Sequence, residues 1–214
     1  MTAIQVICLV LSLVCSAYVL KNTNLNQLAS DKAFQHKLFG AMTALFVLWL
    51  FRVSIYDGLV MHFMALTALT LMLGFRWSVI ASFVVLLGST IIGQESWVMF
   101  GVNALVGVLI PIALTYGVFM FTFHRVPRGL FVYVFLCAFF PGALSMLAKM
   151  LIMSGYYWLD GAYSWDVISY NYTQMTILML FPEAFFNGMI MTCLIVYKPD
   201  LVYTFHDKFY LDGK

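Results

Sequence analysis

Few side chains in this sequence could do chemistry, and they lie within or beside long apolar stretches. His62 carries an imidazole, which binds transition metals readily, and Asp57 precedes it by five residues. Glu183 and Asn187 are four residues apart, so they share one face of a helix. A candidate metal site is formed by Asp57, His62 and Glu183. A candidate intramembrane polar network is formed by Asn103, Glu183 and Asn187.

The elements that must position these side chains are apolar helices. Of 214 residues, 64% are hydrophobic and 9% are charged, against about 25% charged in a soluble domain. A spanning helix needs about 20 apolar residues. We therefore predict an all-α, polytopic integral membrane protein with a single transmembrane domain over residues 1–214. Its seven helices are expected at about 3–20, 38–55, 59–73, 77–92, 98–123, 129–153 and 173–197, before a short tail at 198–214.

The basic residues predict the orientation of these helices. Cytoplasmic loops carry an excess of Lys and Arg, and seven spans with a periplasmic N-terminus place nine of the eleven basic residues on the cytoplasmic side. The two on the outer side are Arg52 and Lys149, and Lys149 is expected to extend its amine to the outer interface. The expected location is the cytoplasmic (inner) membrane of a bacterium, with the C-terminus inside.

The expected depth of the polar residues suggests where they meet. Glu183 lies about ten residues into the last helix, about 15 Å deep, where a carboxylate must be protonated, paired or facing water. Asn103 is a potential partner for it. With His62, these residues are expected to converge on a cavity in the outer half of the membrane. His62 is either a ligand or a packing histidine, and the asparagines are hydrogen-bonding residues between helices.

Three stretches occur in an order that is typical of one transporter family. They are 58–74, GLVMHFMALTALTLMLG; 101–103, GVN, leading to Pro111; and 181–188, FPEAFFNG, followed by 198–201, KPDL. On these residues the sequence resembles the energy-coupling-factor permease family, and within it the CbiM/NikM-type membrane components of cobalt and nickel uptake. The resemblance covers about residues 55–203 and points to an uncharacterised bacterial branch.

The resemblance implies a divalent transition metal, Co²⁺ or Ni²⁺, as the substrate. In the metal-transporting members an N-terminal Met-His pair holds the ion through its amine and a deprotonated amide, together with a His that opens a later helix. His62 matches the later His, whereas this sequence begins Met1-Thr2-Ala3. Oxygen ligands from Asp57, Glu183, Asn103 or water in place of the missing pair would favour a more permissive ion such as Zn²⁺ or Mn²⁺.

The function that the resemblance implies is the substrate-binding membrane component of an energy-coupling-factor importer. Such a component lies in the lipid bilayer and docks to a scaffold permease that carries ATPase subunits. No Gly-x4-Gly-Lys-Ser/Thr loop is present, so ATP hydrolysis would belong to separate subunits. Cys8, Ser12 and Ser16 form a stripe of small residues on the first helix that suits close helix contact, with a partner or within the protein.

Two other classes of function are alternatives to import. One is a membrane interaction or assembly protein that has lost transport and the metal site. The other is an intramembrane enzyme that uses Glu183 as an acid or base, but no HExxH motif accompanies it and no enzyme is expected. No resident cofactor is expected. The net charge of +2 is too small for a nucleic-acid surface, which excludes nucleic acid as a partner.

The orientation can be tested with a topology reporter. A reporter enzyme that is active only in the periplasm, fused after Lys214, should be silent, because the C-terminal tail is expected in the cytoplasm. The same reporter fused before Met1 is the control and should be active. Activity of the C-terminal fusion would contradict the predicted orientation.

Overall fold

The computed structural model describes residues 1–54, 56, 59–127, 129–206 and 210. Most of these residues are helical, and a short antiparallel hairpin interrupts the helices. The chain divides into two compact units. Unit 1 comprises Met1–Met64 and Arg76–Leu109, and unit 2 comprises Ala65–Phe75 and Ile110–Lys214.

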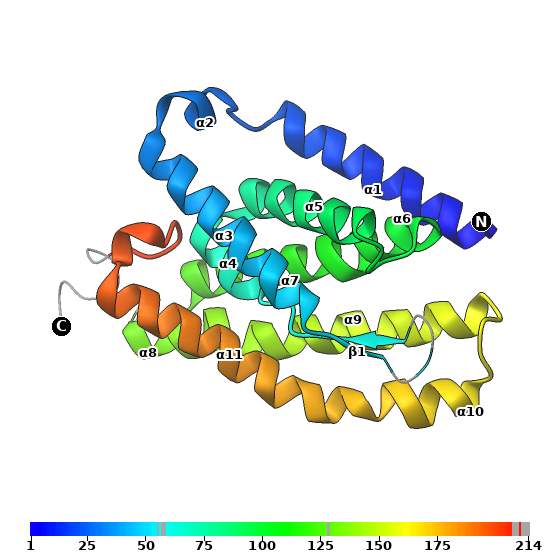
Figure 1. Ribbon diagram of the computed structural model, residues 1–214. Coiled ribbons are helices and arrows are strands. Elements are labelled where there is room, and N and C mark those ends of the chain that lie inside the picture. The colour runs from blue at the N-terminus through cyan, green and yellow to red at the C-terminus, as the bar shows by residue number, and fades with distance from the viewer. Residues whose placement is uncertain (55, 57–58, 128, 207–209, 211–214) are drawn as a thin grey trace. The chain divides into compact units, whose positions relative to one another are not determined.

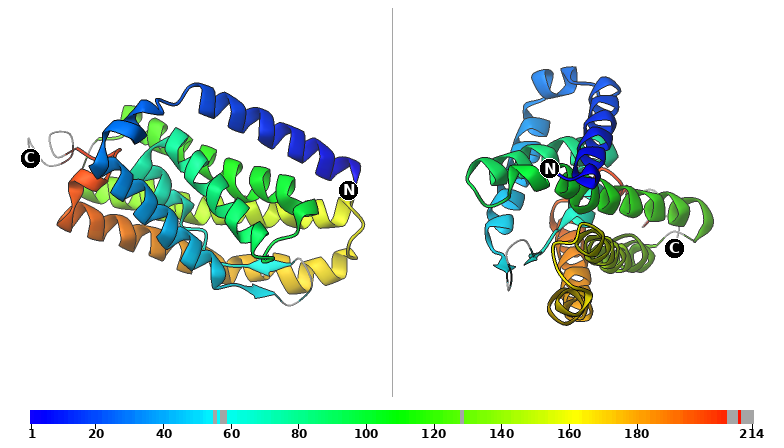
Figure 2. Two further views of the ribbon diagram at one scale, coloured as in Figure 1. Left: turned by 45° about the horizontal axis from the view of Figure 1, so that its top comes forward. Right: turned by 90° about the vertical axis from the view of Figure 1, so that its right-hand side faces the viewer.

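Unit 1 contains three long helices and the hairpin (Figure 1). Its elements are α1 (Ala3–Lys21), α2 (Asn26–Ser30), α3 (Lys32–Leu50), β1 (Val53–Ser54), β2 (Val60–Met61), α5 (Phe75–Ile91), a 3-10 turn (Trp97–Met99), α6 (Phe100–Val102) and a π-helical segment (Asn103–Leu109). Strands β1 and β2 pair with Val53 opposite Met61 and Ser54 opposite Val60. Figure 2 (left) shows this pair as two cyan arrows.

Unit 2 is built on long helices that pack along their length. Its elements are α4 (Leu66–Leu73), α7 (Ile110–Arg125), α8 (Leu130–Val132), a π-helical segment (Tyr133–Phe139), α9 (Phe140–Leu159), α10 (Trp165–Ile168), a second π-helical segment (Ser169–Thr173), α11 (Met175–Tyr197) and a 3-10 turn (Pro199–Leu201). The hydroxyls of Ser154 and Thr173 are 2.9 Å apart, and Gly142 faces Ala184. These contacts show that α9 and α11 run antiparallel.

Among the described residues, five helices are long and apolar enough to cross a membrane. They are Ala3–Lys21, Lys32–Leu50, Trp97–Arg125, Leu130–Leu159 and Trp165–Tyr197, with Phe75–Ile91 as a shorter apolar helix. The helix expected at 38–55 lies earlier than predicted, because Asp31 caps it by accepting a hydrogen bond from the Phe34 amide (3.0 Å). The number of crossings and their orientation stay predictions.

The helix expected at 59–73 is the main departure from the predicted elements. Residues 60–61 form strand β2, and the helix begins only at Leu66. Ala65 has a φ of 52°, in the left-handed region, so the helix cannot continue through it. The eight residues of α4 rise about 12 Å, less than half the hydrocarbon thickness.

A π-helical segment precedes each of the prolines Pro111 and Pro141. Residues 103–109 are π-helical before Pro111, and residues 133–139 are π-helical before Pro141. Proline has no amide hydrogen, so the carbonyl one turn earlier loses its usual α-helical partner. A π-helical register of hydrogen bonds accommodates that loss.

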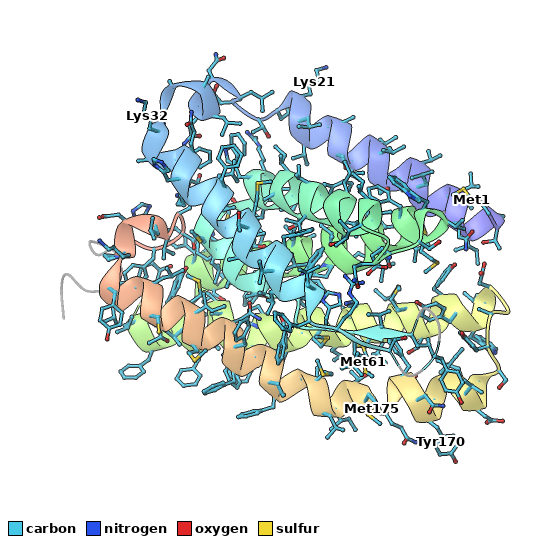
Figure 3. All side chains as sticks on the ribbon, viewed as in Figure 1. Met1, Lys21, Lys32, Met61, Tyr170 and Met175 are labelled. Carbon is cyan, nitrogen blue, oxygen red and sulfur yellow. The ribbon has the colours of Figure 1, made fainter. Side chains whose placement is uncertain are left out.

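Three basic residues of unit 1 lie at the same end of its helices. Figure 3 shows Lys21 and Lys32 at one end of α1 and α3, and Met1 at the other end of α1. Arg76, at the start of α5, donates a hydrogen bond to the Asn22 carbonyl at 2.5 Å. Three of the residues that were expected on the cytoplasmic side therefore gather at one end of this unit.

The small-residue stripe on α1 lies against the protein itself. Ser12 is fully buried and donates its hydroxyl hydrogen to the Leu9 carbonyl, while Cys8 and Ser16 are partly buried. Helix α1 packs on α6, where a Cβ atom on Gly101 would lie 2.5 Å from the Leu9 backbone. This geometry favours the reading of the stripe as intramolecular packing.

Substitution of Gly101 tests this contact. Gly101→Ala should lower the unfolding midpoint of the detergent-solubilised protein, because overpacking costs about 1–3 kcal/mol and exceeds the roughly 0.5–1 kcal/mol that Ala gains over Gly in a helix. Gly107→Ala is the matched control, since a Cβ atom there meets nothing within 4 Å. Equal midpoints for the two variants would refute the close approach of α1.

Candidate functional site

The buried start of α4 is capped by side chains of α11. Helix α4 has no side-chain cap of its own. The Ala65 amide donates to Glu183 Oε1 and the Ala68 amide donates to Asn187 Oδ1, both at 2.8 Å. Because the first amides of a helix have no intrahelical acceptor, Glu183 and Asn187 act together as the missing N-cap.

Glu183 and Asn187 also bind each other. The Asn187 side-chain amide donates to Glu183 Oε1 and to the Glu183 carbonyl, both at 2.8 Å. Glu183 is 1% exposed and Asn187 is fully buried. A Cβ on Gly142 would lie 3.2 Å from the Asn187 side chain, so α9 approaches this pair closely. Asn187, one turn further along the same face of α11, is therefore a hydrogen-bonded partner of Glu183.

The other end of α4 is capped by the segment that follows α11. The Tyr203 amide donates to the Met72 carbonyl at 3.1 Å. The amide and the hydroxyl of Thr204 both reach the Leu71 carbonyl, at 3.2 and 2.8 Å. The Tyr133 hydroxyl lies 2.6 Å from the Thr204 hydroxyl. Residues from one stretch, 183–204, thus supply partners for both ends of α4.

A chain of hydroxyls joins α4 to its neighbours in unit 2. Thr67 and Thr115 bond at 2.9 Å, and Thr115 and Ser145 bond at 3.1 Å. Ser145 also donates to the Pro111 carbonyl at 3.2 Å. All three hydroxyl side chains are at most 1% exposed. Polar groups inside unit 2 therefore hold helices together rather than face water.

His62 belongs to unit 1, directly after strand β2. Its Nδ1 lies 2.9 Å from the Phe63 carbonyl, which can only accept, so the hydrogen resides on Nδ1 and Nε2 is the basic nitrogen of the neutral ring. The ring packs edge-on against Trp49, with centroids 5.4 Å apart. Trp49 Nε1 donates to the Met64 carbonyl at 3.2 Å.

A second polar cluster in unit 1 surrounds Arg52. Its Nη1 donates to Glu95 Oε1 at 2.5 Å and to the Gln94 carbonyl at 3.0 Å, and its Nε donates to the Trp49 carbonyl at 3.0 Å. Asn103 donates to Glu95 Oε2 at 2.8 Å. Asn103 thus bonds within unit 1, while Glu183 and Asn187 bond within unit 2, and the network that joins all three stays a prediction.

The proposed metal ligands are distributed over different parts of the chain. Asp57 lies outside the described residues, His62 is in unit 1, and Glu183 is in unit 2. Within the described ranges, no group of three or more His, Cys, Asp and Glu side chains is placed to hold a metal ion. The three-residue metal site stays a prediction.

The N-terminus uses its second residue as a helix cap. The Thr2 amide donates to Gln5 Oε1 at 2.9 Å, and the Gln5 amide donates to Thr2 Oγ1 at 3.4 Å. This is a capping box at the start of α1.

One expectation about a polar residue needs revision, and two polar residues were missed. Lys149 is 6% exposed, so its side chain is buried and does not extend into water at the interface. An exposed amine was expected because Lys149 lies near the end of the helix predicted at 129–153, where a lysine usually reaches water. In the structure, α9 continues to Leu159. Sequence reasoning also missed Arg52 and Glu95, although an arginine on the outer side, against the charge bias, was a usable signal.

The fold and these clusters define a class: a multi-pass helical membrane protein with a short buried helix and a short hairpin. The chain belongs to the CbiM family, since the family described as "Cobalt uptake substrate-specific transmembrane region" matches residues 1–201. Comparison with curated proteins and with solved structures gave no significant match. Family membership confirms the resemblance and the all-α multi-pass fold class.

Substitutions of Glu183 should separate its roles as acceptor and as charge. Glu183→Ala leaves the Ala65 amide without an acceptor, which costs about 1–3 kcal/mol of unfolding free energy. Glu183→Gln keeps an oxygen that accepts the same hydrogen bonds and should retain most of the stability. Unfolding midpoints of the purified protein in detergent measure both effects.

Thr176→Ala is the control for this series. Thr176 lies on the same helix and is 3% exposed, and its hydroxyl has no hydrogen-bond partner among the described residues. Its loss should change the midpoint much less than Glu183→Ala does. Equal damage from Glu183→Gln and Glu183→Ala would show that the charge, not the acceptor oxygen, stabilises α4.

Proposed function

We propose that the chain is the substrate-binding membrane component of an energy-coupling-factor importer in the cytoplasmic membrane of a bacterium, with a divalent transition metal as cargo. The family match carries this proposal, because it covers residues 1–201 and is described as a substrate-specific region of cobalt uptake. His62, the one retained position of the family's ligand set, follows a hairpin of unit 1 and presents Nε2 as its basic nitrogen.

The energy for transport would come from partner subunits. The chain has no Gly-x4-Gly-Lys-Ser/Thr loop for a nucleotide, so a scaffold permease and ATPases are the proposed partners. We also propose that the chain is not an enzyme, since Glu183 is engaged in capping α4. The alternative is an interaction or assembly protein without transport, which the capping role of Thr2 favours.

Metal titration of the purified protein tests the proposal. The wild type in detergent, produced without an affinity tag, should bind about one Co²⁺ per chain, and His62→Ala should bind at least about tenfold more weakly, because a ligand to the metal is lost. Ni²⁺, Zn²⁺ and Mn²⁺ titrations then rank the preference for the metal.

His124→Ala is the matched control, because His124 is exposed on α7 and its Nδ1 bonds the Met120 carbonyl of its own helix. It should bind Co²⁺ as the wild type does. Equal binding by the wild type and His62→Ala, or binding by neither, would remove His62 as a ligand and favour the assembly protein.

A further inference from the structure

The Arg52 guanidinium has one nitrogen that the described residues leave without a partner. Nε and Nη1 donate to the Trp49 carbonyl, the Gln94 carbonyl and Glu95. Nη2 is buried and makes no hydrogen bond in the described part of the chain. The side chain is 10% exposed. A buried donor without an acceptor is costly, so its two hydrogens suit an acceptor on a ligand.

Both oxygens of Glu95 accept a hydrogen bond from a donor other than this nitrogen. Its Oε1 accepts from Arg52 Nη1, and its Oε2 accepts from Asn103 at 2.8 Å. Asn103 therefore fixes the carboxylate in the position that binds one side of the guanidinium. The remaining donor is held in a defined place by four hydrogen bonds of the Arg52–Glu95–Asn103 group, which makes it a preorganised recognition element.

Arg52 and His62 flank the same end of the hairpin. Val53 pairs with Met61 and Ser54 with Val60, and Arg52 directly precedes one strand while His62 directly follows the other. Trp49 contacts both side chains, since its carbonyl accepts from Arg52 Nε and its ring packs against His62. Arg52 and His62 therefore share Trp49 as a neighbour at the same end of the hairpin.

A guanidinium that keeps an unused terminal donor binds a carboxylate well. We propose that Arg52 binds a carboxylate oxygen of the cargo, so that His62 receives its metal ion as an anionic carboxylate chelate. The cargo then brings part of its own coordination sphere and needs few protein ligands. This inference rests on the proposed metal-binding function and names its substrate class.

The inference is tested by whether citrate raises or lowers the amount of cobalt that the protein retains. Detergent-solubilised protein is mixed with Co²⁺ alone or with Co²⁺ and excess citrate, and bound cobalt and citrate are measured after desalting. If the chelate is the ligand, citrate raises cobalt retention about tenfold or more, with about one citrate bound per cobalt. If the bare ion is the ligand, citrate competes for it and lowers retention.

Two matched variants assign the effect to Arg52. Arg52→Lys keeps a positive charge for Glu95 but removes the second terminal nitrogen, so citrate should now lower cobalt retention instead of raising it. Arg76→Lys, the same substitution elsewhere in unit 1, should behave as the wild type. The unfolding midpoint of each variant checks that the variant is folded.

The outcomes separate this inference from the proposed function. Binding of Co²⁺ that depends on His62 but falls with citrate in the wild type keeps the metal function and overturns the chelate. A citrate enhancement that persists in Arg52→Lys overturns the role of Arg52. Binding of citrate without cobalt, or of neither, overturns both.

Discussion

A helix that ends inside a membrane protein leaves terminal amides and carbonyls that hydrocarbon cannot satisfy. Helix α4 has two such ends and only eight residues. Glu183 and Asn187 accept from its first amides, and Tyr203 and Thr204 donate to its last carbonyls. The polar groups at the two ends of α4 need partners, and this need explains why α11 and the segment after it lie against α4. It also explains why the Glu183 carboxylate is buried.

The peptide group between Met64 and Ala65 connects this requirement to the hairpin. Its carbonyl accepts from Trp49 Nε1 and its amide donates to Glu183, so both polar atoms of one peptide are bound. His62 lies two residues before that peptide and packs against the same Trp49. Each polar atom of this peptide is thus bound by a side chain of its own unit.

The sequence was sufficient for the long helices and for the importance of Glu183, because apolar length and a carboxylate at depth are local signals. The break before α4 was not predictable in this way. Residues 59–73 are apolar throughout, and the left-handed Ala65 follows from hydrogen bonds to residues more than a hundred positions away. The Arg52 group was missed for the same reason, since it depends on the register of a hairpin and on the pairing of Arg52 with Glu95 across 43 positions.

The central claim is that Glu183 caps α4 through the Ala65 amide. Hydrogen exchange of alanine amides, followed by NMR in protein labelled with ¹⁵N-alanine, tests it directly, because Ala65 has no acceptor within α4. The account predicts slow exchange at Ala65 and Ala68 in the wild type, with Ala65 exchanging much faster in Glu183→Ala and unchanged in Thr176→Ala. Exchange at Ala65 as fast as in exposed connections of the wild type would contradict the cap.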